Sequence, residues 1–188
     1  MIEQFLKRIA KTLDQRRIPY MIIGGQAAIV HGRPRVTQDV DITLGMDTDR
    51  LEAVIASCRA LRLKLLPENP RKFSEETQVL PVRDAQSGLR VDFIFSSTPY
   101  ERQAIDRATV VRMTRYPVRF ASAEDVIIHK LFAGRAIDLE DARAVVLRQG
   151  ARLDGAYIRK WLRSFSDVVE DRRGLLMLWE QVVRGTKI

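Results

Sequence analysis

Three aspartates in two otherwise apolar stretches are the residues most able to carry chemistry. Asp39 and Asp41 lie two positions apart, and Asp92 interrupts the apolar run 91–95. Side chains two apart on a strand leave the same face, and neighbouring carboxylates repel each other unless cations neutralise them. Hard oxygen ligands of this kind suit Mg²⁺ or Mn²⁺. If the strand of Asp92 lies beside that of Asp39 and Asp41, three carboxylates converge. Such a set can hold two metal ions for in-line phosphoryl displacement.

A second candidate is the pair Gly24-Gly25, which falls between a predicted buried strand, 20–23, and a predicted short helix, 26–31. Glycine lets a backbone approach a phosphate closely, and a helix N-terminus offers free N–H groups. The turn is therefore a candidate cradle for a triphosphate.

The spacing of apolar residues predicts which elements position these groups. The front of the chain alternates helices and strands, whereas only helices are predicted from residue 122 onward. Pro81 predicts an edge position for its strand. The predicted front elements are a helix over 2–17, strands over 20–23 and 39–44, helices over 26–31 and 49–62, a loop over 64–76, a hairpin of 77–82 and 89–95, a helix over 99–107, and short strands over 109–113 and 118–120.

The C-terminal part has helix caps at regular intervals. Ser122 is predicted to cap a helix that ends near Gly134, Asp138 to open one that ends at Gly150, and Asp154 to open a third. A fourth is predicted over 173–184. The fold class is therefore α/β (α+β), with a small mixed sheet flanked by helices and a C-terminal helical part. The predicted domains are an α/β core, 1–121, and a helical region packed on it, 122–188.

Composition excludes several classes of protein. The 188 residues include 32 Lys and Arg, 24 Asp and Glu, one cysteine and two histidines, for a net charge of +8. A disulfide framework and a Cys-rich zinc site are excluded, and a His-dominated metal site is disfavoured. The positive surplus is spread along the chain. The N-terminus lacks the apolar centre of a signal peptide, and the longest uncharged run, 18–32, contains Pro19 and three glycines, so we expect a cytoplasmic protein without a membrane span.

The order of these motifs resembles the nucleotidyltransferase superfamily, which has the polymerase-beta-like fold. Gly24-Gly25 is followed by Asp39-Val40-Asp41 and then by Asp92. More narrowly, the segments 23–27 and 35–41 are similar to minimal bacterial nucleotidyltransferases, which include the AbiEii-type toxins of type IV toxin–antitoxin systems and their uncharacterised relatives. A later helical motif of Lys, Arg and Asp in those proteins looks like residues 129–141. The resemblance covers about residues 18–150.

The resemblance implies transfer of a nucleoside monophosphate from an NTP to an acceptor hydroxyl, with release of pyrophosphate. Asp39 and Asp41 would hold two Mg²⁺ ions, with Mn²⁺ as an alternative. Asp92 would complete the metal site and accept the proton of the attacking hydroxyl. The main-chain amides near Gly24 and Gly25 would hold the phosphates.

The same resemblance assigns roles to the charged residues that lie around these motifs. Lys130 would neutralise the leaving pyrophosphate, as a compact cation can, and Arg35 would add a bidentate phosphate contact. Arg135, Asp138 and Asp141 would position the nucleotide or the acceptor, or else lock the helical part to the α/β front.

Simpler interpretations stand beside these. Asp92 could form a salt bridge to Arg90 or Arg83, and Lys130 could be a surface lysine that lies along apolar neighbours. The acceptor is open between RNA such as a tRNA end, a protein and a small molecule, and the basic surplus mildly favours RNA. A toxin would have an antitoxin partner. A catalytically silent module that binds nucleic acid or a protein, and a metal-dependent phosphohydrolase, are the alternatives, and the oligomeric state stays open.

Overall fold

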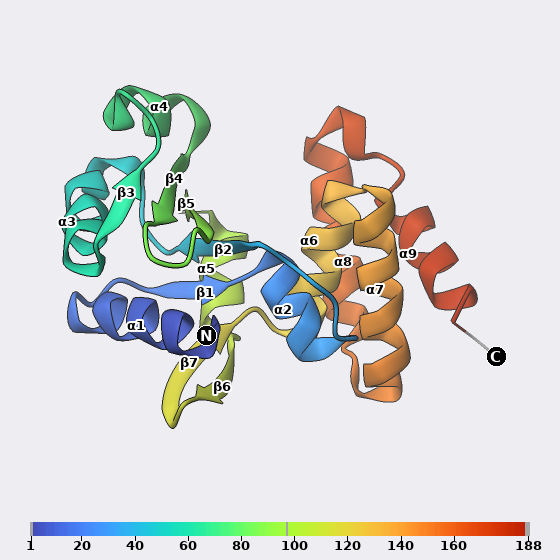
Figure 1. Ribbon diagram of the computed structural model, residues 1–188. Helices are drawn as coiled ribbons and strands as arrows, with labels where there is room; N and C mark the ends of the chain where they lie inside the picture. The colour runs from blue at the N-terminus through green and yellow to red at the C-terminus, as the bar shows by residue number, and fades with distance from the viewer. Residues whose placement is uncertain (1, 97, 187–188) are drawn as a thin grey trace. The chain divides into compact units, whose positions relative to one another are not determined.

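The computed structural model of the protein describes residues 2–96 and 98–186. The chain forms two compact units (Figure 1). Unit 1 comprises Met1–Ile23 and Thr37–Phe120, and unit 2 comprises Gly24–Val36 and Ala121–Ile188. The segment Gly24–Val36, which precedes the strand of Asp39 in the chain, therefore groups with the C-terminal helices.

Unit 1 is built on one mixed sheet of seven strands. Its strands are β1 (Tyr20–Ile22), β2 (Asp39–Leu44), β3 (Leu63–Leu65), β4 (Val79–Asp84), β5 (Arg90–Phe95), β6 (Thr109–Met113) and β7 (Tyr116–Phe120). They lie in the order β3-β4-β5-β2-β1-β7-β6. The pairs β2–β5 and β1–β7 are parallel, and the remaining neighbours are antiparallel.

The helices of unit 1 are α1 (Ile2–Gln15), α3 (Leu51–Leu61), α4 (Pro70–Thr77) and α5 (Pro99–Asp106), with a short 3₁₀ turn η1 (Thr48–Arg50). Three of these four helices, all except α4, bury apolar side chains. Helix α1 packs against α3, β6 and β7. Its buried positions recur at helical spacing, as the sequence predicts: Phe5, Leu6, Ile9, Ala10 and Leu13.

The segment 64–76, predicted as a loop, contains strand β3 and helix α4 instead. Asn69 caps α4 by accepting a hydrogen bond from the Lys72 amide, and Pro70 occupies the first turn. Only Ser74 of this helix is buried. The helix therefore has no apolar stripe that a search for periodicity could detect.

The predicted edge position of Pro81 is wrong, because β4 is paired on both sides and β3 forms the edge. The Pro81 carbonyl accepts a hydrogen bond from the Leu66 amide, 3.1 Å away, just beyond the last residue of β3. In a strand the N–H and C=O of one residue point the same way. The missing donor of Pro81 therefore faces the point where the neighbouring strand has already ended.

Unit 2 is helical. It contains α2 (Gly24–His31), α6 (Ala123–Ala133), α7 (Ala136–Gln149), α8 (Gly155–Val168) and α9 (Leu175–Arg184), with 3₁₀ turns η2 (Gly150–Arg152) and η3 (Glu170–Arg172). Helix α6 packs against α2, α7, α8 and α9. Ser122 and Asp154 cap α6 and α8 as predicted, but Arg135, not Asp138, is the N-cap residue of α7, and Asp138 lies in its first turn.

Buried polar contacts tie the helices of unit 2 together. The Asp125 side chain is fully buried; its carboxylate accepts hydrogen bonds from Ser122 Oγ at 2.7 Å and Tyr157 Oη at 2.9 Å. The Tyr157 contact joins α6 to α8. His31 Nε2 lies 2.8 Å from the Ala121 carbonyl, so this nitrogen carries the proton. These contacts fix the ends of α2 and α6.

The mixed sheet flanked by helices, followed by a helical part, confirms the predicted fold class. Among the described residues, no helix is both long and apolar enough to span a membrane.

Candidate active site

The three aspartates lie on one face of the sheet in unit 1. Strands β2 and β5 are parallel, and their register places Asp41 directly beside Asp92. Asp39 and Asp41 leave the same face of β2, and that face is shared by Asp92 across the ladder. Asp39 is exposed, and the other two are half-buried. The predicted convergence of the three carboxylates requires their strands to be neighbours, and the pairing of β2 with β5 meets this condition.

The residues that alternate with the aspartates along β2 and β5 explain why the aspartates lie on the open face of the sheet. The side chains of Val40, Ile42, Val91 and Phe93 are completely buried on the opposite face. A slip of one residue would exchange this core for carboxylates, so the hydrophobic pattern sets the register. The aspartates are therefore held by the sheet and need no contact with one another.

A cation, Arg90, lies on the same face. It is the register partner of Asp39, and its Nε donates a hydrogen bond to Asp92 Oδ1 at 2.9 Å. This hydrogen bond raises the pKa of Arg90, with a smaller opposing effect of burial and further increases from the charges of Asp92, Asp39 and Asp41. The salt bridge to Arg90, one of the simpler interpretations of Asp92, is thus present in the structure.

The donor set of this face fits a hard divalent cation, because it consists of three carboxylates and no nitrogen or sulfur ligand. Within residues 2–96 and 98–186, however, no three His, Cys, Asp or Glu side chains are placed closely enough to hold a metal ion. The three carboxylates are suitable metal ligands, but in this structure one of them, that of Asp92, accepts a hydrogen bond from Arg90 instead.

The glycine pair begins a helix. Helix α2 starts at Gly24 itself, two residues earlier than predicted, and Gly24 has a φ of 62°, a conformation that glycine adopts without strain. The preceding residue, Ile23, donates its amide to the Asp41 carbonyl at 2.9 Å. The first amides of α2 have no partner within the helix, as in any helix, and are suited to an anion.

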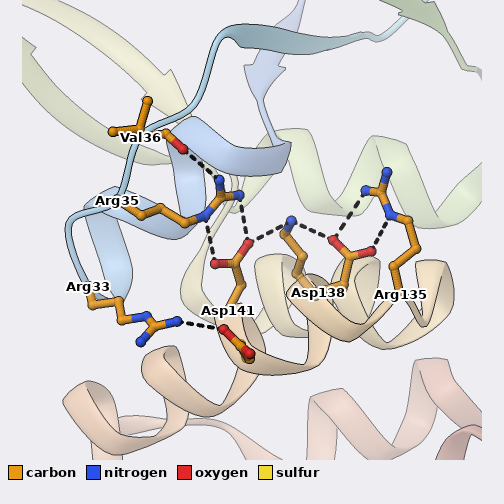
Figure 2. A network of polar contacts seen from close by, with 8 residues as sticks. Arg33, Arg35, Val36, Arg135, Asp138 and Asp141 are labelled. Carbon is orange, nitrogen blue, oxygen red and sulfur yellow. Dashed lines mark hydrogen bonds and ion pairs between the residues drawn. The ribbon is translucent and has the colours of Figure 1, made fainter.

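Unit 2 contains a buried ionic network that the sequence predicted only in outline (Figure 2). Lys130 of α6 is 5% exposed, and its Nζ lies 2.7 Å from Asp138 Oδ1 and 2.9 Å from Asp141 Oδ2. Both carboxylates belong to α7 and are almost completely buried. Lys130 is therefore not a surface lysine, and it joins α6 to α7.

Two arginines complete the network from either side. Arg35 binds Asp141 through Nε at 2.8 Å and Nη2 at 2.9 Å, a bidentate contact between residues 106 positions apart. Arg135 binds Asp138 through Nε at 2.6 Å and Nη2 at 3.2 Å, while its side chain stays 73% exposed. The three cations predicted to bind nucleotide thus all contact carboxylates of α7 in the structure.

The network keeps both carboxylates ionised. Burial by itself would raise the pKa of Asp138, but hydrogen bonds from Arg135 and Lys130 outweigh it and the pKa is lowered. The pKa of Asp141 is lowered in the same way, with Arg35 and Lys130 as donors. Three cations face two carboxylates here, so the network carries one excess positive charge.

Some groups of the site were not anticipated from the sequence. Asp125 was not singled out, although the spacing Ser122-x-x-Asp125 is that of a capping box. The tie between the loop of Arg35 and helix α7 has no local signal, because its partners are far apart in the chain.

Comparison with known families gives one match over nearly the whole chain. The model of a family described as nucleotidyltransferase of unknown function (DUF6036) matches residues 1–187. A search of curated proteins by sequence finds no match.

Several solved structures share the fold. The antibiotic-resistance factor ANT(2'')-Ia in solution has a TM-score of 0.60 at 16% identity, with 91% of this chain and 96% of that chain covered. The lincosamide antibiotic adenylyltransferase LnuA, bound to lincomycin, has a TM-score of 0.53 at 14% identity over 76% and 94%. An antigenic nucleotidyltransferase-like protein from Paracoccidioides brasiliensis has a TM-score of 0.56 at 16% identity over 94% and 92%. At these identities the likeness concerns the fold.

Proposed function

The chain belongs to the DUF6036 family of nucleotidyltransferases, and we propose that it transfers a nucleoside monophosphate from an NTP to a hydroxyl group of an acceptor. The family match confirms the predicted superfamily and enzyme class. The observation that carries the proposal is the register of β2 and β5, which sets Asp41 beside Asp92 with Asp39 on the same face. That face offers the carboxylates that nucleotidyl transfer needs.

The reaction exchanges one bond to phosphorus for another. The acceptor oxygen forms a bond to the α-phosphorus of the NTP, the bond from that phosphorus to the bridging oxygen breaks, and pyrophosphate leaves. Asp92 accepts the proton of the attacking hydroxyl once it is released from Arg90. Asp39, Asp41 and Asp92 would hold Mg²⁺, two ions in the full form of the proposal. Bound Mg²⁺ would supply charge neutralisation and alignment of the phosphates.

Residues of unit 2 are proposed to bind the triphosphate. The amides at Gly24 and Gly25, at the start of α2, suit a phosphate oxygen. Lys130, Arg35 and Arg135 would neutralise pyrophosphate as one network, in which Asp138 and Asp141 hold the three cations in place. Its excess positive charge and the exposed Arg135 side chain support this role.

For the acceptor we propose an RNA hydroxyl, because the net charge of +8 favours a polyanion. A small molecule is the other acceptor class to be tested. Two structural neighbours were solved with antibiotics or their products: ANT(2'')-Ia in complex with adenylyl-2''-tobramycin, and LnuA bound to lincomycin. Modification of RNA in the cell would make the protein a candidate toxin with an antitoxin partner. Expression would then arrest growth.

The test is incubation with each α-labelled NTP, with Mg²⁺ or Mn²⁺, in the presence of total cellular RNA, cell lysate, or an aminoglycoside and a lincosamide. A labelled acceptor identifies both the nucleotide and the acceptor class. The double variant Asp39→Asn, Asp41→Asn should abolish labelling, because it removes two carboxylates of the β2 face. Asp49→Asn, which neutralises an exposed acid outside the sheet, is the matched control and should label normally.

The same experiment separates the alternatives. Release of free monophosphate without a labelled acceptor indicates a phosphohydrolase. No labelled product under either metal, together with RNA binding that survives the double Asp variant and no NTP binding by calorimetry, indicates a catalytically silent binding module. Either pattern refutes the proposal.

A further inference from the structure

We propose that Arg90 is an internal counter-cation of the carboxylate face, which competes with divalent metal for Asp92 and keeps metal affinity low until nucleotide arrives. The inference rests on the proposed function for its meaning, but it concerns metal binding to the protein alone. It names a positioning residue that acts on the metal through Asp92.

Strand geometry places Arg90 on the same face as the three aspartates. Arg90 and Asp92 are two apart on β5, so their side chains share one face, and register places Arg90 beside Asp39. The guanidinium Nε reaches Asp92 Oδ1 at 2.9 Å. Arg90 thus contacts the aspartate that lies directly beside Asp41, and its hydrogen bond competes with a metal ion for that carboxylate oxygen.

The charge of Arg90 acts on the whole carboxylate face, because it interacts with Asp39 and Asp41 as well as with Asp92. A metal ion that enters among these carboxylates must either displace Arg90 or bind beside it against charge repulsion. An anionic triphosphate that arrives with the metal would attract the released guanidinium, which can bind a phosphate group through two N–H donors.

The Arg90 side chain is exposed enough to leave Asp92. Its side chain is 45% exposed, while that of Asp92 is 20% exposed. An ion pair at a half-exposed position contributes little to stability, typically about 0–1 kcal/mol. Release of Arg90 from Asp92 therefore has a small cost, which fits an exchangeable contact better than a structural one.

The experiment measures Mn²⁺ affinity without nucleotide, by the electron paramagnetic resonance signal of free Mn²⁺. Coulomb's law for a unit charge roughly 5 Å from a divalent ion predicts a change on the order of tenfold even at the dielectric constant of water. We expect Arg90→Gln to bind Mn²⁺ about tenfold more tightly than the wild type, and Arg90→Lys, which keeps the charge, to stay near the wild-type value.

Arg83 offers a matched control. It is the register partner of Arg90 on β4, but its Nη1 donates to the Gly88 carbonyl at 3.1 Å. Arg83→Gln should leave Mn²⁺ affinity unchanged. The proposal is overturned if Arg90→Gln binds Mn²⁺ no more tightly than Arg83→Gln, or if Arg90→Lys binds as tightly as Arg90→Gln, since charge would then not be the cause.

The outcome is separable from that of the proposed function. Tighter Mn²⁺ binding by Arg90→Gln supports the counter-cation role even if no NTP is ever transferred. Loss of that tighter binding when Asp39→Asn and Asp41→Asn are added to Arg90→Gln locates the ion on the carboxylate face. Retention of tighter binding in the combined variant contradicts the inference.

Discussion

The buried ammonium of Lys130 gives a large and testable stability effect. Its Nζ binds Asp138 at 2.7 Å and Asp141 at 2.9 Å. Lys130→Met replaces it with an apolar, unbranched side chain of similar length, so little volume is lost. The change leaves two buried carboxylates without their shared cation. Breaking a buried ion pair in this way costs about 3–5 kcal/mol, a large part of the roughly 5–15 kcal/mol that stabilises a typical domain.

Urea unfolding followed by circular dichroism measures the loss. With a slope of about 2.5 kcal/mol/M, the midpoint at pH 7 should fall by roughly 1–2 M. The exposed Lys64, on the edge strand β3, supplies the control. Lys64→Met should change the free energy of unfolding by no more than about 0.5 kcal/mol.

The pH dependence tests the cause. The folded-state pKa values of Asp138 and Asp141 are lowered, so both groups contribute stability above their unfolded pKa, near about 3.9, and lose it as pH falls below that value. Lys130→Met removes a cation that these carboxylates need only when ionised. The difference between wild type and Lys130→Met should therefore shrink as pH falls toward 3. A difference that is absent at pH 7, or that grows on acidification, would refute the reasoning.

Three further predictions concern other buried groups. Tyr157→Phe should lower the free energy of unfolding by about 1–3 kcal/mol, because buried Asp125 loses a hydrogen-bond donor; an unchanged urea midpoint would contradict this. Burial lowers the pKa of His31, with partial compensation from its hydrogen bond to Ala121. The neutral His31 side chain therefore contributes stability that is lost as pH falls through the region of its ordinary pKa. His31→Gln should flatten the dependence of the urea midpoint on pH between 7 and 5. Burial raises the pKa of Cys58 to about 12, so a disulfide reagent at pH 8 should label the native protein slowly and the urea-unfolded protein fast, whereas equal rates would show that the thiol is accessible.

Alternation of apolar and polar residues was enough to predict β2, and an apolar run beside a turn predicted β5. The shared face of Asp39 and Asp41 followed from their spacing, whereas Asp92 joins that face because β5 pairs with β2. The family resemblance supplied the remaining step, that the two strands lie side by side. Parallel neighbours this far apart in the chain cannot be inferred from spacing alone.

Two features were beyond the reach of a single sequence. Helix α4 is polar on nearly every side, and only Asn69 and Pro70 mark its beginning. Lys130 finds its partners because α6 packs against α7, and Arg35 finds Asp141 because the loop that follows α2 contacts α7. The sequence shows charges at these positions, but whether a charge meets a phosphate or a carboxylate is decided by packing.

The position of Gly24–Val36 in unit 2 leads to a last prediction, about whether the carboxylate face depends on the cation network of Lys130 and Arg35. The carboxylate face of β2 and β5 is held by ladder hydrogen bonds and a buried core within unit 1, whereas Lys130, Arg35 and their aspartates are held within unit 2. Because each set is held by contacts within its own unit, we expect Lys130→Met to destabilise the protein and yet to bind Mn²⁺ with wild-type affinity at a temperature where it stays folded. The electron paramagnetic resonance titration measures this directly. A folded Lys130→Met protein with altered Mn²⁺ affinity would show that the cation network shapes the carboxylate face after all.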